Sequence, residues 1–138
     1  MKRIIMDAGP LVAWFCPRDE HYDWAGPAFA KILQGGIVCE AVITEVCHLV
    51  AKEGVPRGQV IEFVVESGMQ PVSLVNELPA IASLLTRYAD APMDFADACV
   101  VRLAELFPDA TVCTTDSHFK FFRKHERENI PLLAPFTT

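Results

Sequence analysis

The sequence predicts an α/β protein, a three-layer α/β/α sandwich with a central parallel sheet of about five strands. Short apolar segments of strand length alternate with longer segments in which apolar residues recur every three or four positions. Parallel strands require long crossover connections, and the helical segments supply them. No repeat or low-complexity segment interrupts this alternation in the 138 residues. We therefore expect one domain over residues 1–138, with its own core.

The chain begins with a predicted strand and a helix. Residues 3–6 form a short apolar segment that ends at Asp7, as a buried strand does at a turn. Pro10 suits the first position of a helix, because its missing N–H would have no partner there. We therefore predict a helix over residues 10–15.

The second strand is predicted between helices. Apolar residues at helical spacing indicate a helix over 21–33, and the pair Gly35-Gly36 is typical of a helix end. Residues 37–39 then suit a short buried strand. Two amphipathic helices follow, over residues 42–52 and through 60–64.

The remaining elements continue the alternation to the end of the chain. Apolar segments bounded by prolines indicate strands, and three- and four-residue spacing indicates helices. We predict strands over 71–75, 110–114 and 131–133, helices over 78–88 and 96–107, and a short basic helix over 119–124.

The composition is that of a folded protein, with 51% apolar and 22% charged residues. Four of the five cysteines lie in apolar runs and none forms a C-x-x-C pair, which favours reduced, buried thiols. Met1-Lys2-Arg3 is not followed by a signal-peptide core, and no apolar run reaches membrane-spanning length. We therefore expect a cytoplasmic, soluble protein with no membrane association.

Two aspartates follow predicted strands. Asp7 comes directly after the first strand, and Asp116 comes after the fourth. In open α/β sheets, ligands bind beyond the carboxyl ends of the strands, where the strand order reverses. These two carboxylates are therefore candidates for one site.

Three further acids lie on predicted helices. Glu45 interrupts an apolar helix face, and Asp94 and Asp97 are spaced to share one face near a helix start. Taken singly, each acid is more often structural, and Asp94 is equally suited to cap its helix. The joint pattern of acids at element boundaries and in apolar settings favours a functional site.

Converging carboxylates need a cation or a proton. Two of them about 5 Å apart repel by roughly 3 kcal/mol at an effective dielectric constant near 20. Hard oxygen ligands without a histidine or thiol cluster suit Mg²⁺ or Mn²⁺, as one ion or two. Such ions activate water for attack on a phosphodiester. The net charge of −6 by itself disfavours binding of nucleic acid, but bound cations change the local charge of the binding face.

Four short motifs resemble those of the PIN-domain nucleases, and in particular the VapC-type toxins of toxin–antitoxin pairs. Their order and spacing cover nearly the whole chain. They are Met6-Asp7-Ala8-Gly9-Pro10-Leu11-Val12-Ala13, Thr44-Glu45-Val46, Asp94-Phe95-Ala96-Asp97-Ala98 and Thr114-Thr115-Asp116-Ser117-His118-Phe119.

The resemblance implies a metal-dependent endoribonuclease. It implies that the catalytic and metal-binding acids are Asp7, Glu45, Asp97 and Asp116, and that Thr114 helps to orient the site. It further implies an RNA substrate, a homodimer and a cognate antitoxin that blocks the site. Asp94 is then interpreted as a supporting acid or a helix cap.

A basic stretch with interleaved phenylalanines follows Asp116. Lys120, Arg123 and Lys124 are candidates for contacts to RNA phosphates, with a solvated helix face as the alternative.

Two histidines and three aromatic residues could have more than one role. His48 and His118 are close in sequence to the acids but are more often surface or packing residues. Trp14, Phe15 and Trp24 suit either the core or a dimer interface.

Other functions are compatible with parts of the pattern. An RNA-processing nuclease without an antitoxin would use the same acids, and a non-catalytic RNA- or protein-binding module would keep the fold alone. An aspartyl-phosphate phosphatase would need an acid two residues after Asp7, where this chain has Gly9. A ribonuclease H-like fold would continue into antiparallel strands, whereas Pro10 indicates a helix.

Overall fold

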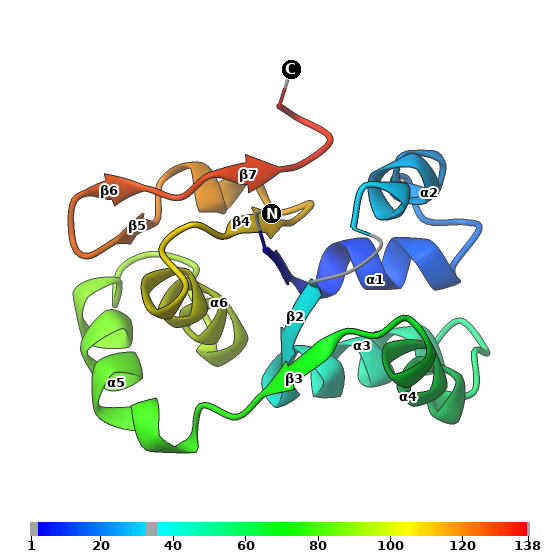
Figure 1. Cartoon of the computed structure of the whole chain (residues 1–138), viewed down its shortest axis with the longest axis horizontal. Coiled ribbons are helices and arrows are strands. Elements are labelled where there is room, and N and C mark those ends of the chain that lie inside the picture. Colours follow the sequence, from blue (N-terminus) through cyan, green and yellow to red (C-terminus); the bar gives the residue numbers. More distant parts are fainter. Residues whose placement is uncertain (1–2, 33–35, 138) are drawn as a thin grey trace.

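Five short parallel strands form the central sheet, in the order β3-β2-β1-β4-β7 (Figure 1). The structure is a computed structural model that describes residues 3–32 and 36–137. The strands are β1 (Ile4–Met6), β2 (Gly36–Cys39), β3 (Gln70–Val72), β4 (Thr111–Cys113) and β7 (Leu132–Leu133). Each pairing in this sheet is parallel, which confirms the predicted sheet and excludes the ribonuclease H-like alternative.

The strand order reverses between β1 and β4. The chain passes from β1 outward through β2 to β3 and then returns to β4 on the opposite side of β1. In the register, Met6 lies beside Cys113, so the residues that follow both strands emerge together. Open α/β sheets bind ligands at such a switch point.

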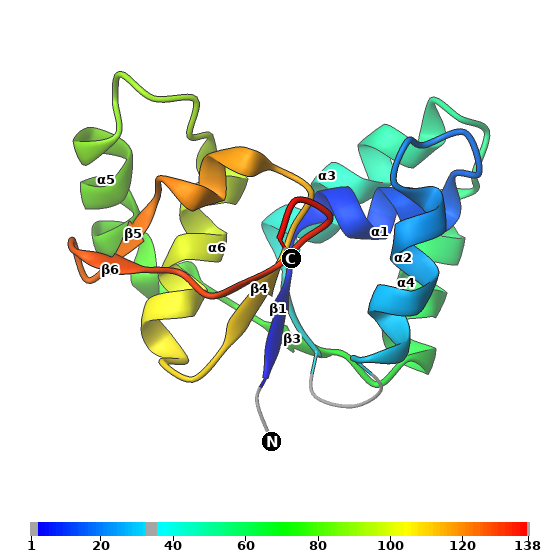
Figure 2. The ribbon, with the colours of Figure 1, turned by 90° about the horizontal axis from the view of Figure 1, so that it is seen from above.

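Helices cover both faces of the sheet. Figure 2 shows α5 and α6 on one side and α1, α2 and α4 on the other. The helices are α1 (Ala8–Phe15), α2 (Tyr22–Ala30), α3 (Glu40–Ala51), α4 (Arg57–Glu66), α5 (Leu78–Arg87) and α6 (Phe95–Leu106). Ile5, Ile37 and Val112 are fully buried, as expected for strands covered on both faces. The three-layer sandwich is thereby confirmed.

Some element boundaries differ from the prediction. Pro10 is the third residue of α1, because the helix already begins at Ala8 with Asp7 at its N-cap. Gly36 does not end the second helix but is the first residue of β2, paired with Ile4, and Gly35 lies outside the described residues. The third strand is shorter than the predicted 71–75, because a 3-10 turn, η1 (Val75–Glu77), follows it closely.

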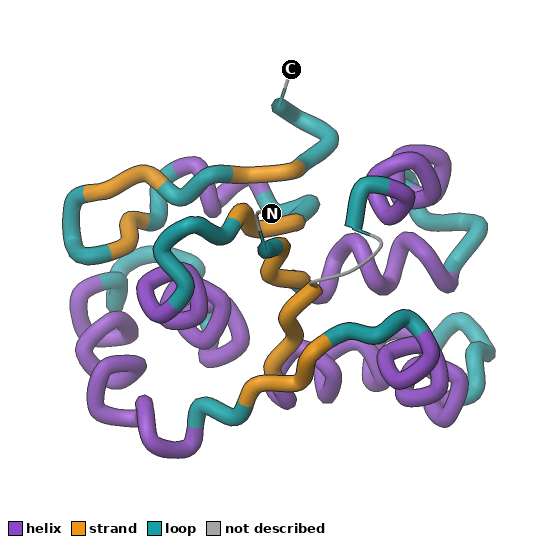
Figure 3. The backbone as a smooth tube through the Cα atoms, in the orientation of Figure 1, coloured by secondary structure: helices purple, strands orange, loops and turns teal. Residues whose placement is uncertain are grey.

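The predicted basic helix over 119–124 is wrong. A 3-10 turn, η2 (Ser117–Lys120), leads into an antiparallel hairpin of β5 (Arg123–Lys124) and β6 (Glu128–Asn129). Figure 3 shows this hairpin outside the central sheet, before the chain returns to β7. His125 and Glu126 at its tip have φ values of 48° and 70°, in the left-handed region that a helix excludes.

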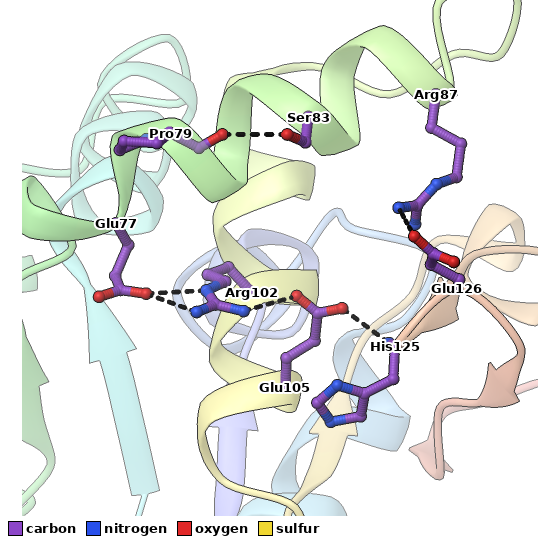
Figure 4. A network of polar contacts seen from close by, with 8 residues as sticks. All are labelled: Glu77, Pro79, Ser83, Arg87, Arg102, Glu105, His125 and Glu126. Carbon is purple, nitrogen blue, oxygen red and sulfur yellow. Dashed lines mark hydrogen bonds and ion pairs between the residues drawn. The ribbon is translucent and has the colours of Figure 1, made fainter.

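An ion-pair network ties the hairpin and α5 to α6 (Figure 4). Arg102 on α6 lies 2.7 Å from the Glu77 carboxylate and 3.0 Å from the Glu105 carboxylate. The second oxygen of Glu105 accepts a hydrogen bond from the His125 backbone N–H at 2.7 Å. At the hairpin tip, Arg87 and Glu126 pair at 3.1 Å. These contacts hold η1 and the hairpin against α6, and they join the hairpin to α5.

The cysteines agree with the expectation from composition. All five are free thiols, and Cys16, Cys39, Cys99 and Cys113 are buried. Within residues 3–32 and 36–137, no helix is long and apolar enough to cross a membrane.

Candidate active site at the carboxyl end of the sheet

Asp7 is a nearly buried carboxylate at the end of the central strand. Asp7 is 5% exposed, and its backbone N–H donates to the Cys113 carbonyl at 3.0 Å. The Thr114 hydroxyl donates to Asp7 Oδ2 at 2.6 Å. Asp7 is therefore fixed from both β1 and the end of β4.

Thr114 connects Asp7 to the second strand-end aspartate. Its Oγ1 accepts a hydrogen bond from the Asp116 backbone N–H at 3.0 Å, while the same hydroxyl donates to Asp7. Asp116 Oδ1 in turn accepts from the His118 backbone N–H at 2.9 Å and lies 2.7 Å from His118 Nδ1. Among the described contacts, Asp116 Oδ2 receives no hydrogen bond, so it is free to accept another ligand.

Asp94 and Asp97 form a reciprocal cap at the start of α6. The Asp97 backbone N–H donates to Asp94 Oδ1 at 2.8 Å, and the Asp94 backbone N–H donates to Asp97 Oδ2 at 3.0 Å. This is a capping box built from two aspartates. The cap role that the sequence left open for Asp94 is thus present. Asp97 keeps its second carboxylate oxygen clear of this cap.

Glu45 projects from the middle of α3 into a surface groove. The groove has a volume of about 500 Å³ and is lined by Ala41, Thr44, Glu45, His48, Asp94, Phe95 and Ala96. Glu45 has no part in the ion pairs of the described residues. His48 lies on the same wall and is exposed.

The pKa values show that these carboxylates are electrostatic neighbours. Burial raises the pKa of Asp7 to about 6. Hydrogen bonds from the Thr114 hydroxyl and the Ala8 backbone oppose this shift, and the charge of Asp116 adds to it. Burial also raises the pKa of Glu45, and the charges of Asp94, Asp7 and Asp116 raise it further. The acids therefore share one unfavourable concentration of negative charge.

Asp97 has the same perturbation. Burial raises its pKa, the hydrogen bond from the Asp94 backbone opposes this, and the charges of Asp94 and Asp7 add to the increase. Desolvation and like charges both disfavour the ionised form. A bound cation would relieve both effects.

The carboxylate oxygens suit a hard divalent cation, although the acids do not surround a common point. In the part of the chain that the structure describes, no three acidic, histidine or cysteine side chains stand at metal-binding spacing. One oxygen of Asp97 is held in the helix cap, and Glu45 is partly exposed on a flexible side chain. Carboxylate oxygens of this kind are the ligands that Mg²⁺ and Mn²⁺ prefer.

The basic residues after Asp116 lie differently from the prediction. The Lys124 ammonium is buried and donates to the Pro108 carbonyl at 2.9 Å, beyond the far end of α6 from Asp97. This position does not suit an RNA contact near the acids. The Arg123 guanidinium donates to the Lys120 and Phe122 carbonyls, and the Lys120 ammonium lies 4.9 Å from the Phe136 ring centre.

Sequence reasoning gave no role to Gly9 or Phe95. A Cβ atom at Gly9 would overlap the Thr115 side chain, so glycine lets the loop between Thr114 and Asp116 lie against α1. Phe95 is a 48% exposed aromatic ring beside Asp94 in the groove. The sequence signals were a glycine two residues after the first acid and an aromatic residue inside an acidic motif.

Comparisons with known proteins agree with this architecture. The family model of the PIN domain matches residues 4–124. Among solved structures, VapC20 of Mycobacterium tuberculosis, described as a toxin that cleaves the sarcin–ricin loop, matches with a TM-score of 0.72 and 15% sequence identity. The match covers 83% of this chain and 90% of that chain, and at this identity it shows a shared fold. Among curated proteins, no match was found.

Proposed function

The chain belongs to the PIN-domain family, and from that premise we propose that it is a metal-dependent endoribonuclease acting as the toxin of a toxin–antitoxin pair. The observation that carries the proposal is the acidic cluster at the strand-order switch. There, Asp7, Glu45 and Asp97 have raised pKa values, and the described ion pairs give them no lysine or arginine partner.

We assign Mg²⁺ or Mn²⁺, as one ion or two, to Asp7, Glu45, Asp97 and Asp116. When bound, the cation supplies Lewis-acid activation of water and neutralises negative charge at the phosphodiester. The Thr114 hydroxyl holds one Asp7 oxygen and fixes the orientation of the carboxylate. No covalent protein nucleophile is required, because water is the attacking group.

The other side chains of the site orient the acids and the RNA, and they do not neutralise the negative charge. His118 and the backbone at residue 118 hold one oxygen of Asp116, leaving its other oxygen for ligation. The capping box orients Asp97 in the same way from α6. Phe95, exposed beside Glu45 in the groove, offers a face on which an RNA base can stack.

The proposed partners are RNA, a cognate antitoxin and a second copy of the chain, acting in the cytoplasm. Exposed apolar residues support a protein partner: Val65 is 72% exposed on α4, and Trp14 and Phe63 line a neighbouring apolar hollow of about 300 Å³. Lys120 and Arg123 remain proposed phosphate contacts, whereas the buried Lys124 is not retained.

Metal-dependent RNA cleavage tests the activity. We expect the wild-type protein to cleave RNA with Mg²⁺ or Mn²⁺ and to lose this activity with EDTA, and we expect Asp7→Asn to abolish it. Asp109→Asn is the matched control, because it removes the same charge. Asp109 is exposed and precedes β4, at the opposite end of the sheet. Equal cleavage by wild type and Asp7→Asn would refute the site.

The alternatives give different results. A wild-type protein that binds RNA without cleaving it in either metal would indicate a non-catalytic module. Growth arrest on expression, absent with Asp7→Asn and relieved by a protein encoded by the neighbouring gene, would support the toxin role. Cleavage without growth arrest would instead favour an RNA-processing nuclease that has no antitoxin.

A further inference from the structure

A small cavity lies beside the acidic groove, at the same end of the sheet. Its volume is about 270 Å³. It is lined by Cys39, the last residue of β2, and by Ser73, which directly follows β3, so it lies where open α/β sheets bind ligands. Ala41 and Phe95 line both the cavity and the groove. A chain bound along the groove can therefore place one of its side groups in the cavity.

The cavity has a buried apolar floor and an exposed apolar rim. Leu74 and Cys99 are buried, whereas Val75 is 66% exposed and Leu78 and Phe95 are each 48% exposed. Exposed apolar residues grouped around a hollow are typical of binding sites. Pockets for drug-sized ligands have volumes of about 300–1,000 Å³. This smaller cavity therefore suits one flat group, such as a single nucleobase.

Two polar side chains at the cavity are available for hydrogen bonds to a ligand. Among the described contacts, the carboxylate of the exposed Glu40 has no hydrogen-bond or ion-pair partner, and only its backbone carbonyl accepts, from the Thr44 hydroxyl. The Ser73 hydroxyl oxygen accepts from the Val75 backbone N–H at 3.5 Å, which leaves its hydrogen to be donated. An ionised carboxylate accepts on two oxygens and donates nothing.

Guanine is the RNA base that matches such an acceptor. Its ring N–H and its amino group lie side by side on the Watson–Crick edge, so they can reach both oxygens of one carboxylate. Uracil presents one N–H between two carbonyl oxygens, which a carboxylate repels. Adenine and cytosine present an amino group beside a ring nitrogen that cannot donate. The Ser73 hydroxyl can donate to a guanine acceptor.

We propose that the cavity is a specificity subsite that binds an unpaired guanine of the RNA near the cleaved phosphodiester. The base stacks on the Phe95 ring, and the Glu40 carboxylate accepts hydrogen bonds from its Watson–Crick edge. Because the charge of Glu40 repels phosphates, it contributes selectivity among bases and not general affinity for RNA. The inference rests on the proposed function, since the RNA reaches the cavity along the groove that contains Glu45.

RNA binding without metal tests the subsite independently of cleavage. Fluorescence anisotropy is measured in EDTA at low salt, with short single-stranded uridine RNAs that carry one central guanosine or one central inosine. Inosine lacks only the amino group of guanine. We expect the guanosine RNA to bind wild type at least about 10-fold more tightly, because a hydrogen bond to a charged group is lost with inosine. Equal affinities for the two RNAs would overturn the proposal.

Variants at the cavity assign the selectivity to its residues. Glu40→Gln should bring the guanosine-to-inosine affinity ratio close to one, since an amide offers a single acceptor oxygen. Glu62→Gln removes the same charge from an exposed position on α4, which does not line the cavity, and should keep the wild-type ratio. Phe95→Ala should weaken guanosine RNA by about 5-fold or more, whereas Phe95→Tyr keeps the stacking face. A wild-type ratio in Glu40→Gln would refute the assignment.

Cleavage in Mn²⁺ distinguishes failure of the subsite from failure of the nuclease. Guanosine-selective binding by a wild-type protein that cleaves neither RNA would support the subsite and contradict the nuclease. Equal rates of cleavage of both RNAs would support the nuclease and overturn the subsite. Analytical ultracentrifugation examines a protein partner as the occupant. If Phe95→Ala dissociates a dimer and leaves its affinity for both RNAs at the wild-type value, the cavity is a protein contact and the proposal fails.

Discussion

The negative charge of two groups of acids in this protein is compensated in different ways. At the side of α6, Arg102 lies between Glu77 and Glu105 and neutralises both within 3.0 Å (Figure 4). At the carboxyl end of the sheet, the acids receive hydrogen bonds from a hydroxyl and from backbone N–H groups, and the pKa values of Asp7, Glu45 and Asp97 are raised. The first group carries its own cation and is structural. Under the proposed function, the second binds a cation that comes from outside.

After the loss expected for Asp7→Asn, the next largest effect is expected from Asp97→Asn. The amide oxygen of asparagine can still accept the helix-cap hydrogen bond from Asp94, so the fold is retained, but the charged metal ligand is lost. We expect RNA cleavage to fall by more than about 100-fold, since even partners outside the coordination sphere cost 10- to 100-fold. Single-turnover cleavage at saturating Mn²⁺ measures it. Activity within a few-fold of wild type would remove Asp97 from the site.

The pH dependence of stability without metal comes next. The folded-state pKa of Asp7 is raised to about 6 from 3.8, so the folded protein binds more protons than the unfolded chain between these values. The stability from this group is complete below pH 3.8 and is lost as pH rises through about 6. Relative to Asp7→Asn, the free energy of unfolding should fall by about 2 to 3 kcal/mol across this window.

Chemical denaturation of both proteins in EDTA at several pH values measures that difference. Adding Mg²⁺ near neutral pH should restore the loss in wild type alone, because ligand binding stabilises the folded state by mass action. Parallel pH profiles of the two proteins would contradict the raised pKa of Asp7.

Removal of the Thr114 hydroxyl tests the link between the two strand-end aspartates. Thr114→Val keeps the shape of the side chain but loses the contacts to Asp7 and to the Asp116 backbone. We expect cleavage to fall by about 10- to 100-fold. Thr114→Ser keeps the hydroxyl and should retain most activity. If valine and serine behave alike, the hydroxyl does not orient the acids.

Arg102→Met tests the opposite half of the comparison. It leaves Glu77 and Glu105 without their cation, so the free energy of unfolding should fall by about 1 to 2 kcal/mol, a modest loss because the pair is partly solvent-exposed. Cleavage by the folded fraction should be unchanged. Denaturation midpoints and cleavage rates of the same preparation measure both quantities. A large loss of cleavage without unfolding would show that the two regions are coupled.

The sequence predicted the places of Asp7 and Asp116 in the fold better than the structure of the basic segment that follows. Asp7 and Asp116 follow buried apolar strands, and parallel strands bring such ends together whatever the rest of the chain does. Whether Asp94 caps α6 depended on a reciprocal contact with Asp97, which spacing permits but does not require. The full assignment of the four acids stays a prediction.

The region after Asp116 shows why sequence patterns fail locally. Phe119 and Phe122 are three residues apart and both buried, as in a helix, but Phe119 lies in a 3-10 turn and Phe122 directly precedes β5. The turn residues His125 and Glu126 take positive φ values without any glycine to indicate it. The burial of Lys124 depends on the Pro108 carbonyl, a partner that no local pattern reveals.

Binding of Mn²⁺ tests the contrast between the two acidic regions most directly. Electron paramagnetic resonance measures the free ion as each protein is titrated. We predict that wild type and Arg102→Met each deplete the free Mn²⁺ signal by one or two ions per chain, whereas Asp7→Asn leaves it nearly unchanged. A wild-type protein that leaves the signal intact, or an Asp7→Asn variant that binds as many ions as wild type, would contradict a metal site at the end of the sheet.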